Sequence, residues 1–536
     1  GDATYSDGFN VYTSIDSRLQ TAANRSHRNA LLSYDKRHGY RGPISRQLLD
    51  EQSGEEQWMN LLRQHREING LLPALVLEVV EQVAIVYEPH RGVLRIDWPG
   101  LQWAAPGTGY GRIGEKPKQA ADILSRGDVV RIVEDYKGQW SLAQVPVVEG
   151  ALVSLDPNDG AIRALVGGFN FVNSNFNRVT QAERQPGSNF KPFTYSAGLE
   201  KGFTLASLIN DAPVVFEDEG LEATWRPENY SGKVFGPTRL HEALVKSRNL
   251  VSIRLLRAIG IPYTIKYVSR FGFDKSRLPK DLSLALGSGA VTPLEVVSGY
   301  SVFANGGYRT IPYFIDRIDN ADGETEYQAE PFVVCEFCEA QARARRAVKK
   351  DGVAETVTDE RDLFVGPPIR EEMPPVNIAP RVITPQNAYL MRTMMMDVIS
   401  RGTGRRALVL NRKDIGGKTG TTNDQQDAWF SGFSPDVVTT AWVGFDKPQP
   451  LGERETGGRA ALPMWIEYMK TALHGLPVKP LVQPPGLVTV RIDPETGLLA
   501  GADHPDAMFE TFRVDNVPKR HAPKPARGSS GATEGV

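Results

Sequence analysis

The sequence predicts an α+β protein in which one antiparallel sheet takes its strands from both ends of a long domain. Two β-type runs at 151–155 and 161–166 flank the turn-forming segment 156–160, which is typical of a hairpin. Helical patterns then dominate from about 191 to 305, and three further β-type runs follow between 414 and 446. The first two runs and the last three can therefore pair in one sheet of about five strands.

Composition and charge are those of an ordinary globular protein. The chain has 536 residues, 40% hydrophobic and 24% charged, which is enough for a large core and about two to four domains. A net charge of −2 gives no indication of binding to nucleic acid or to an anionic membrane. Proline and glutamate interrupt the most apolar stretch, 71–87, so no transmembrane helix is predicted. The first residues lack a basic and apolar leader, so we expect any signal or anchor to lie outside this sequence.

Residues 1–72 are predicted to be linker helices that pack on the main domain. Apolar residues recur at helical spacing from about 14 to 35, and Ser14 or Asp16 can cap this helix. A second helical stretch is expected from about 44 to 66.

Residues 73–148 are predicted to form a small β domain. About five short β-type runs, among them 92–96 and 128–133, are separated by Gly and Pro. This spacing is typical of a barrel of the oligonucleotide/oligosaccharide-binding type, called OB-like below. Because the charge of this segment is mixed, we expect a spacer or protein-docking role rather than nucleic-acid binding.

The main domain is predicted to span 149–478. Within it, 334–375 is rich in charge and Pro and is expected to be a mobile insertion, with a basic binding arm as the alternative. The C-terminal part, 479–536, is expected to hold a small β segment with a strand at 487–492, followed by a flexible tail.

The chain has two cysteines, Cys335 and Cys338, in a C-x-x-C spacing. A structural zinc site usually needs four ligands and no second pair exists, so no metal site is predicted. The flanking residues do not resemble the start of a redox βαβ unit. Free thiols or a short local disulfide are the remaining interpretations, and no cofactor is expected.

Ser188 and Lys191 are the first candidate catalytic residues. Pro192 avoids losing a hydrogen bond only in the first turn of a helix, so the helix must begin near Ser188. Helix-terminal amides would favour negative charge on the Ser188 oxygen, and Lys191 at i+3 would share its face. Burial and a second cation such as Lys418 would keep Lys191 neutral enough to act as a base. The alternative is a capping serine beside a solvated surface lysine.

Ser247 and Asn249 form a second candidate motif, S-R-N, at a predicted helix junction. Ser247 would pass a proton from Lys191 to a leaving amine, while Asn249 would bind a substrate amide and hold Lys191 in place. The alternative is a capping serine and a turn asparagine.

The third motif, Lys418-Thr419-Gly420, is the most specific of the three. It lies on a predicted strand between glycines and Thr421, where missing side chains would let a substrate backbone pair with the strand edge. Lys418 and the hydroxyls of Thr419 and Thr421 suit a terminal carboxylate. The amides of Ser188 and Thr421 would form an oxyanion hole.

The order S-x-x-K, S-x-N, K-T-G is the pattern of penicillin-binding proteins and serine β-lactamases. The chain resembles the class A penicillin-binding proteins of Gram-negative bacteria over nearly its whole length. The matching segments are 13–16 with Leu19 and Gln20, 34–42, 184–188, 225–230, 284–288, 303–307 and 418–430. This resemblance implies a transpeptidase fold, with helices on both faces of the sheet and an all-helical lobe, and an inserted OB-like domain.

The resemblance implies a D,D-transpeptidase that cross-links peptidoglycan stem peptides ending in D-Ala-D-Ala through an acyl-enzyme on Ser188. β-Lactams would acylate the same serine. It also implies a periplasmic protein anchored in the inner membrane by a segment outside this sequence, with protein activators docking on the OB-like domain. A D,D-carboxypeptidase, a slow β-lactam hydrolase and a non-catalytic binding or sensor module are the alternatives.

Overall fold

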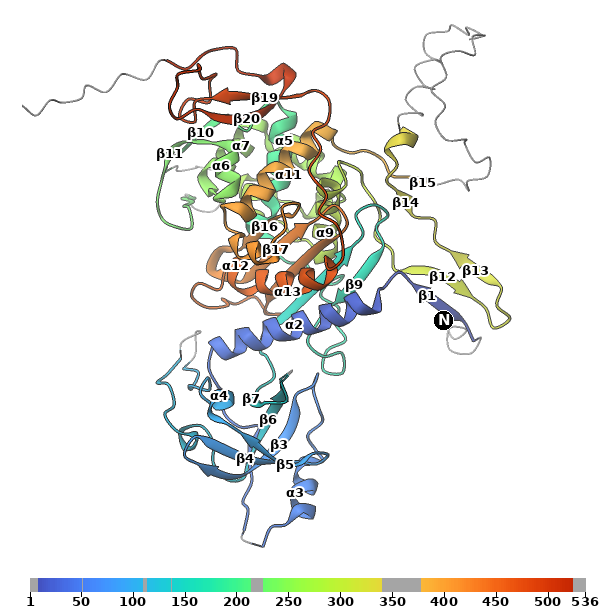
Figure 1. The fold of residues 1–536 in the computed structure, drawn as a ribbon, viewed down its shortest axis with the longest axis vertical. Helices are drawn as coiled ribbons and strands as arrows, with labels where there is room; N and C mark the ends of the chain where they lie inside the picture. Colours follow the sequence, from blue (N-terminus) through green and yellow to red (C-terminus); the bar gives the residue numbers. More distant parts are fainter. Residues whose placement is uncertain are drawn as a thin grey trace, which may run out of the picture.

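The structure, a computed structural model, describes residues 8–50, 52–108, 113–135, 137–213, 225–339 and 377–523. A long helix, α2 (Ser17–Arg37), runs between a larger domain and a small β domain (Figure 1). Among the helices in these ranges, none has both the length and the apolar character needed to cross a bilayer.

The larger domain is built on a five-stranded sheet in the order β16-β17-β18-β8-β9. Every neighbouring pair in it is antiparallel. The strands are β8 (Glu149–Leu155), β9 (Ile162–Val166), β16 (Gly416–Thr421), β17 (Asp427–Phe433) and β18 (Val438–Gly444). The predicted sheet with strands from both ends of the domain is therefore confirmed, and β16 lies at one edge.

Helices cover both faces of this sheet and divide its core in two. On one face, α2 and α13 (Leu462–Ala472) pack against the strands, with the short α12 (Gly457–Ala460) beside them. On the other face, a second core joins the sheet to an all-helical lobe. The helices of this lobe and face are α5 (Lys191–Glu200), α6 (Leu240–Val245), α7 (Asn249–Ile259), α8 (Ile261–Val268), α9 (Pro293–Ala304) and α11 (Pro385–Ser400).

Helix α2 forms where the sequence predicts it, and Asp16 is its cap. The side chain of Asp16 accepts a hydrogen bond from the backbone N of Leu19 at 2.9 Å, which satisfies one of the free amides of the first turn. Lys36 and Arg37 in the last turn complement the negative end of the helix dipole. Burial of one apolar face against the sheet supplies the rest of the stabilisation.

The small domain contains a six-stranded sheet in the order β2-β6-β3-β4-β5, with β7 paired to β6. Its elements are β2 (Ser45–Arg46), α3 (Glu55–Leu62), β3 (Leu72–Val80), β4 (Val83–Glu88), β5 (Gly92–Ile96), α4 (Trp98–Leu101), β6 (Asp128–Glu134) and β7 (Trp140–Ala143). The expected β domain of about five short strands is therefore present, with one further strand before it.

The prediction of a helix over 44–66 is wrong for its first half. Ser45 and Arg46 pair with β6 as an edge strand, because pairing satisfies backbone groups that an isolated helix start would leave open. Only α3 is helical, and it begins after Gly54. Helix α3 packs on β3 of the small domain.

Smaller β elements lie outside the two larger sheets. A hairpin of β10 (Leu208–Asp211) and β11 (Gly236–Arg239) interrupts the middle of the domain, where the sequence predicts mainly helices. A second sheet joins β1 (Asn10–Thr13), β12 (Ile315–Asp319) and β13 (Thr325–Gln328), and a short pair joins β14 (Phe332–Val333) and β15 (Asn377–Ile378). Cys335 and Cys338 form a disulfide after β14, which decides between the two interpretations of this pair. Most of the expected mobile insertion and the end of the tail, 340–376 and 524–536, lie outside the described residues.

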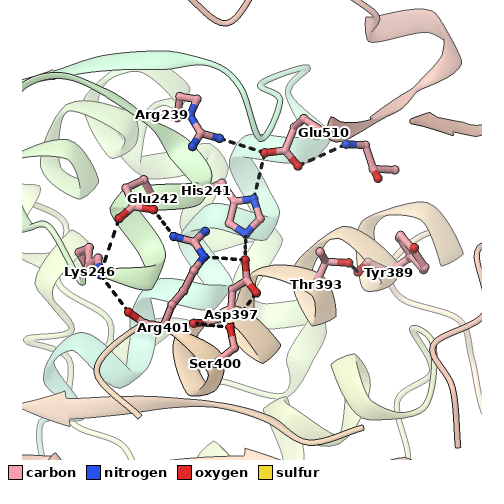
Figure 2. Close-up of polar contacts among 11 residues, drawn as sticks. Arg239, His241, Glu242, Lys246, Tyr389, Thr393, Asp397, Ser400, Arg401 and Glu510 are labelled. Carbon is pink, nitrogen blue, oxygen red and sulfur yellow. Dashed lines mark hydrogen bonds and ion pairs between the residues drawn. The ribbon is translucent and has the colours of Figure 1, made fainter. Parts of the chain in front are cut away.

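A C-terminal hairpin, β19 (Leu487–Ile492) and β20 (Met508–Arg513), packs on the lobe through a cluster of charged side chains (Figure 2). His241 of α6 lies at its centre, with Nδ1 3.0 Å from Glu510 of β20 and Nε2 3.1 Å from Asp397 of α11. Arg239 contacts the same oxygen of Glu510 at 3.2 Å, and Arg401 contacts Asp397 at 3.0 Å. The cluster therefore joins three elements that are distant in sequence.

Burial opposes the charged form of His241, but its contacts with Asp397 and Glu510 outweigh burial and raise the pKa of this histidine. A raised pKa in the folded state means that the stabilisation is fully present below the unfolded pKa of about 6.5. It is lost as the pH rises through the folded pKa. The attachment of the hairpin is therefore expected to weaken in alkaline solution.

We predict that His241→Gln lowers the free energy of unfolding most at pH 6 and progressively less above it. Removing one partner of a buried ion pair costs about 3–5 kcal/mol, because the remaining charges stay buried. Urea unfolding of both proteins across pH 5.5 to about 9 measures the difference. His474→Gln, at an exposed histidine, is the control and should change stability little at any pH. A loss that is equal at all pH values would contradict the prediction.

Candidate active site

The three candidate motifs meet at one open cavity of about 1000 Å³. It lies where β16, the start of α5 and the α6–α7 junction come together. Its lining includes Ser188, Ser247, Asn249, Thr419, Thr421, Trp225, Glu228, Asn229, Thr403 and the 423–425 segment. The sequence motifs contribute four of these residues, Thr421 follows the third motif, and the rest come from segments to which no role was assigned.

Ser188 lies in a 3₁₀ turn, η2 (Gly187–Phe190), that leads directly into α5. Pro192 falls in the first turn of α5, as the sequence predicts. Gly187 has a φ of 55°, and a Cβ at this position would lie 2.6 Å from the carbonyl oxygen of Thr421. Only glycine allows the turn to approach β16 this closely. Ser188 is half-buried and lines the cavity.

A buried ion pair fastens the turn before Ser188 to the sheet. Nε of Arg184 lies 2.7 Å from Oδ1 of Asp427 on β17, and the indole of Trp442 donates to the same oxygen at 2.9 Å. The indole of Trp429 donates to the carbonyl of Gln185 at 2.8 Å. Two strands of the central sheet therefore position the segment that carries the candidate nucleophile.

Lys191 is fully buried, and its Nζ has three acceptors. It donates to Oδ1 of Asn249 at 2.7 Å, to the backbone carbonyl of Ser247 at 2.8 Å and to the hydroxyl of Ser247 at 3.4 Å. The solvated surface lysine, the alternative to a base, is thereby ruled out. The hydrogen bonds of Nζ go to the S-R-N motif and not to Ser188.

Ser247 lies at the junction of α6 and α7, with a φ of 58°. Left-handed backbone is strained for a residue other than glycine, and such strain often marks functional positions. Here it brings the hydroxyl of Ser247 between two lysines. Nζ of Lys418 donates to that hydroxyl at 2.9 Å, and the more distant Nζ of Lys191 reaches it from the other side.

Lys418 points from the edge strand β16 and is fully buried. Besides Ser247, its Nζ donates to the carbonyl of Thr419 at 3.0 Å. Burial lowers the pKa of Lys418 to about 7. The pKa of Lys191 also falls well below its ordinary value, through burial first and then through the charges of Lys418 and Arg248, while Asp211 acts in the opposite direction. Its surroundings therefore favour the neutral form of Lys191 more than water does.

The amide of Asn249 is already engaged at both ends. Its Oδ1 accepts from Lys191, and its Nδ2 donates to the carbonyl of Glu228 at 2.8 Å. Its position beside Lys191 agrees with the holding role expected from the sequence. One hydrogen of Nδ2 is left for a substrate amide.

The K-T-G strand differs in detail from the expectation. A Cβ on Gly420 would lie 2.4 Å from the carbonyl of Pro186, so this glycine makes room for the serine turn rather than for substrate. The hydroxyl of Thr421 accepts from the backbone N of Gly457 at 3.0 Å. The hydroxyl of Thr419 lies 2.7 Å from that of Thr403, within the cavity lining.

Sequence reasoning missed several lining residues. Thr403 lies between two glycines, which is a turn signal but carries no chemical indication. The 225–230 segment matched the family without being given a role. Asp424 and Gln425, in the loop between β16 and β17, both have a φ of 55°, and no sequence pattern marks that strain.

Comparisons with known proteins agree with this geometry. The family model "Penicillin binding protein transpeptidase domain" matches 150–465, and "Penicillin-binding protein OB-like domain" matches 40–148. Penicillin-binding protein 1A of Pseudomonas aeruginosa is 46% identical over 522 residues, covering 97% of this chain and 63% of the relative. The protein of the same name from Escherichia coli is 39% identical, covering 93% of this chain and 63% of its own length.

A solved structure gives the same result in three dimensions. The crystal structure of penicillin-binding protein 1A from Haemophilus influenzae superposes with a TM-score of 0.82 at 33% identity, over 98% of this chain and 74% of that one. The chain thus spans about 63% of the length of the two curated relatives named above. From the family model over the larger domain and from these relatives, we conclude that the chain belongs to the penicillin-binding protein transpeptidase family.

Proposed function

We propose that this chain is a serine D,D-transpeptidase that cross-links peptidoglycan stem peptides ending in D-Ala-D-Ala. The observation that carries the proposal is the convergence of three distant motifs on one hydroxyl. The Ser247 oxygen lies 3.4 Å from the Lys191 nitrogen and 2.9 Å from the Lys418 nitrogen, in the cavity that Ser188 also lines. Such a site can move a proton among a nucleophile, a base and a leaving group.

In the acylation step, the Ser188 hydroxyl attacks the carbonyl carbon of the penultimate D-alanine and gives its proton to neutral Lys191. The oxyanion that forms would be held by the backbone amides of Ser188 and Thr421. The C–N bond then breaks, and the amine of the terminal D-alanine takes the proton that Lys191 passes through Ser247. The product is an ester between Ser188 and the stem peptide.

In the second step, an acceptor amine from a neighbouring stem attacks this ester. Its proton enters the same relay and returns to the Ser188 oxygen as the ester bond breaks. The donor peptide would lie along the free edge of β16, with its terminal carboxylate near Lys418, Thr419 and Thr421. Asn249 would bind a substrate amide. A D,D-carboxypeptidase differs only in using water as the acceptor.

β-Lactams carry an acylating carbonyl beside a carboxylate, so we expect them to acylate Ser188. We expect the resulting ester to be hydrolysed slowly. From the family we further propose a periplasmic setting with an inner-membrane anchor outside this sequence. Protein activators would dock on the OB-like domain. We propose that this domain begins near residue 40 instead of 73, because β2 belongs to its sheet.

We predict that Ser188→Ala abolishes a stable penicillin adduct, because it removes the hydroxyl that the proposed mechanism acylates. Stability should change by less than about 0.5 kcal/mol, since Ser188 contributes little packing. Intact-protein mass spectrometry after mixing with a penicillin measures the adduct. Ser231→Ala, at an exposed serine lining the same cavity, is the control and should keep it. Rapid loss of the adduct from the parent protein would indicate a β-lactam hydrolase. A parent protein that forms no adduct at all would indicate a non-catalytic binding module.

We predict a bell-shaped pH dependence for the second-order rate constant of acylation. The rate should rise as Lys191 loses its proton, well below the ordinary lysine pKa of 10.5. It should fall through the pKa of Lys418, about 7, because the substrate carboxylate requires a cation there. In Lys418→Arg the alkaline limb should disappear, since arginine stays charged. An alkaline limb that is the same in both proteins would rule out this role for Lys418.

A further inference from the structure

One segment that matches the family has no part in the mechanism above, yet it contacts the site. Four residues of the segment 225–230 line the cavity that the S-R-N motif also lines. Two hydrogen bonds join this segment to Asn249. The carbonyl of Glu228 accepts from Asn249 Nδ2 at 2.8 Å, and Oδ1 of Asn229 accepts from the Asn249 backbone N at 2.8 Å. Asn249 is therefore held from one side by this segment and contacts Lys191 on the other.

Asn229 in turn is fastened to a buried carboxylate. Its Nδ2 donates to both oxygens of Asp211, at 2.8 and 3.0 Å, and to the carbonyl of Lys233 at 2.9 Å. The orientation of the Asn229 amide is settled by these partners, because a carboxylate can only accept and a backbone N–H can only donate. A continuous series of hydrogen bonds therefore runs from Asp211 through Asn229 and Asn249 to Lys191.

Asp211 is the last residue of β10, and its side chain is fully buried. Burying a carboxylate is costly unless hydrogen bonds and an opposite charge compensate. The Asn229 amide supplies the bonds, and the Arg248 guanidinium supplies the charge, with Nε 3.9 Å from Asp211 Oδ2. Arg248 itself lies over the ring of Phe235, 3.3 Å from its centroid. A buried charge this close to the site calls for a functional reason.

We propose that Asp211 and Asn229 are a positioning pair that orients Asn249, and through it Lys191, for acyl transfer. This inference rests on the proposed function. Neither residue touches the reacting atoms, so their effect is on the geometry and charge of the groups that do. The pair also explains why the β10–β11 hairpin interrupts the helical lobe: it carries Asp211 to the base of the S-R-N junction.

The charge of Asp211 has a second consequence. Burial and the cations Lys418 and Arg248 lower the pKa of Lys191, and Asp211 is the carboxylate that opposes them. The polar surroundings of Lys191 are these three charged groups, Oδ1 of Asn249, and the hydroxyl and backbone carbonyl of Ser247. Removing the Asp211 charge should therefore lower the pKa of Lys191 further.

An exchange of the two side chains tests the positioning role. Asn229→Asp keeps the acceptor for the Asn249 backbone N but sets two carboxylates against each other. We expect it to lower the second-order rate of penicillin acylation by about 100-fold, the cost of a small misplacement of reacting groups. The double variant Asp211→Asn with Asn229→Asp restores one amide and one carboxylate and should recover most of that rate. A double variant no faster than Asn229→Asp would overturn the proposal.

The single variant Asp211→Asn tests the charge alone, because its amide oxygen can still accept from Asn229. We expect the acid limb of the acylation profile to move to lower pH. Asp35→Asn, at a buried carboxylate of α2 paired with Arg41, is the control and should leave the profile unchanged even if stability falls. An unshifted limb in Asp211→Asn would overturn the electrostatic part of the inference.

A measurement without turnover separates this inference from the proposed function. The titration of Lys191 can be followed by ¹³C NMR of lysine Cε, with the signal assigned from Lys191→Ala. If the parent forms no penicillin adduct, the proposed function fails, while the titration still decides on the pair. A lower Lys191 pKa in Asp211→Asn supports the pair, and an identical titration curve overturns it.

Discussion

Two fully buried lysine nitrogens share one hydroxyl oxygen, and the geometry of the site depends on the cost of that arrangement. An ammonium away from water is unfavourable unless it is paired, so each lysine shifts toward its neutral form. That shift suits the role of base proposed for Lys191. The same burial requires that every donor find an acceptor, and Ser247, Asn249 and the Thr419 carbonyl provide them.

Contacts in the surrounding fold fix the positions of these groups. The Arg184–Asp427 pair fastens the serine turn to the sheet, and Gly187 allows it to touch β16. The junction of α6 and α7, which lines the same cavity, is held by Asn229 and Asp211 from the β10–β11 hairpin. The proposed nucleophile, base and relay thus come from different elements, each with its own buried polar support.

The His241 cluster extends this pattern to the C-terminal hairpin. Figure 2 shows His241 and Arg401 in this cluster. His241 is on α6, the helix that ends just before Ser247, and Arg401 lies two residues before Thr403, which lines the cavity. The hairpin is therefore attached to the same two elements that deliver Ser247 and Thr403. Its contacts stabilise the lobe behind the site.

The sequence determined the elements whose signals are local. The capped helix α2, the hairpin of β8 and β9, the strands β16 to β18 and the start of α5 at Pro192 follow from caps, turns and alternation that neighbouring residues alone specify. The three motifs and their order likewise identified Ser188, Lys191 and Lys418 as candidates. The prediction of a helix over 44–66 was wrong in its first half, because β2 pairs there with an edge of the small sheet. That partner is distant in sequence, so local patterns do not reveal it.

Only the tertiary structure decided what those residues do to one another. Burial of Lys191 and Lys418, and hence their lowered pKa values, depends on atoms from the whole lobe and cannot be inferred from spacing. The support of Asn249 by Asn229 and Asp211 joins segments with no common pattern, and the reason for Gly420 became clear only when Pro186 was found against it. Local sequence sets backbone preferences, whereas desolvation and long-range hydrogen bonds are properties of the packed chain.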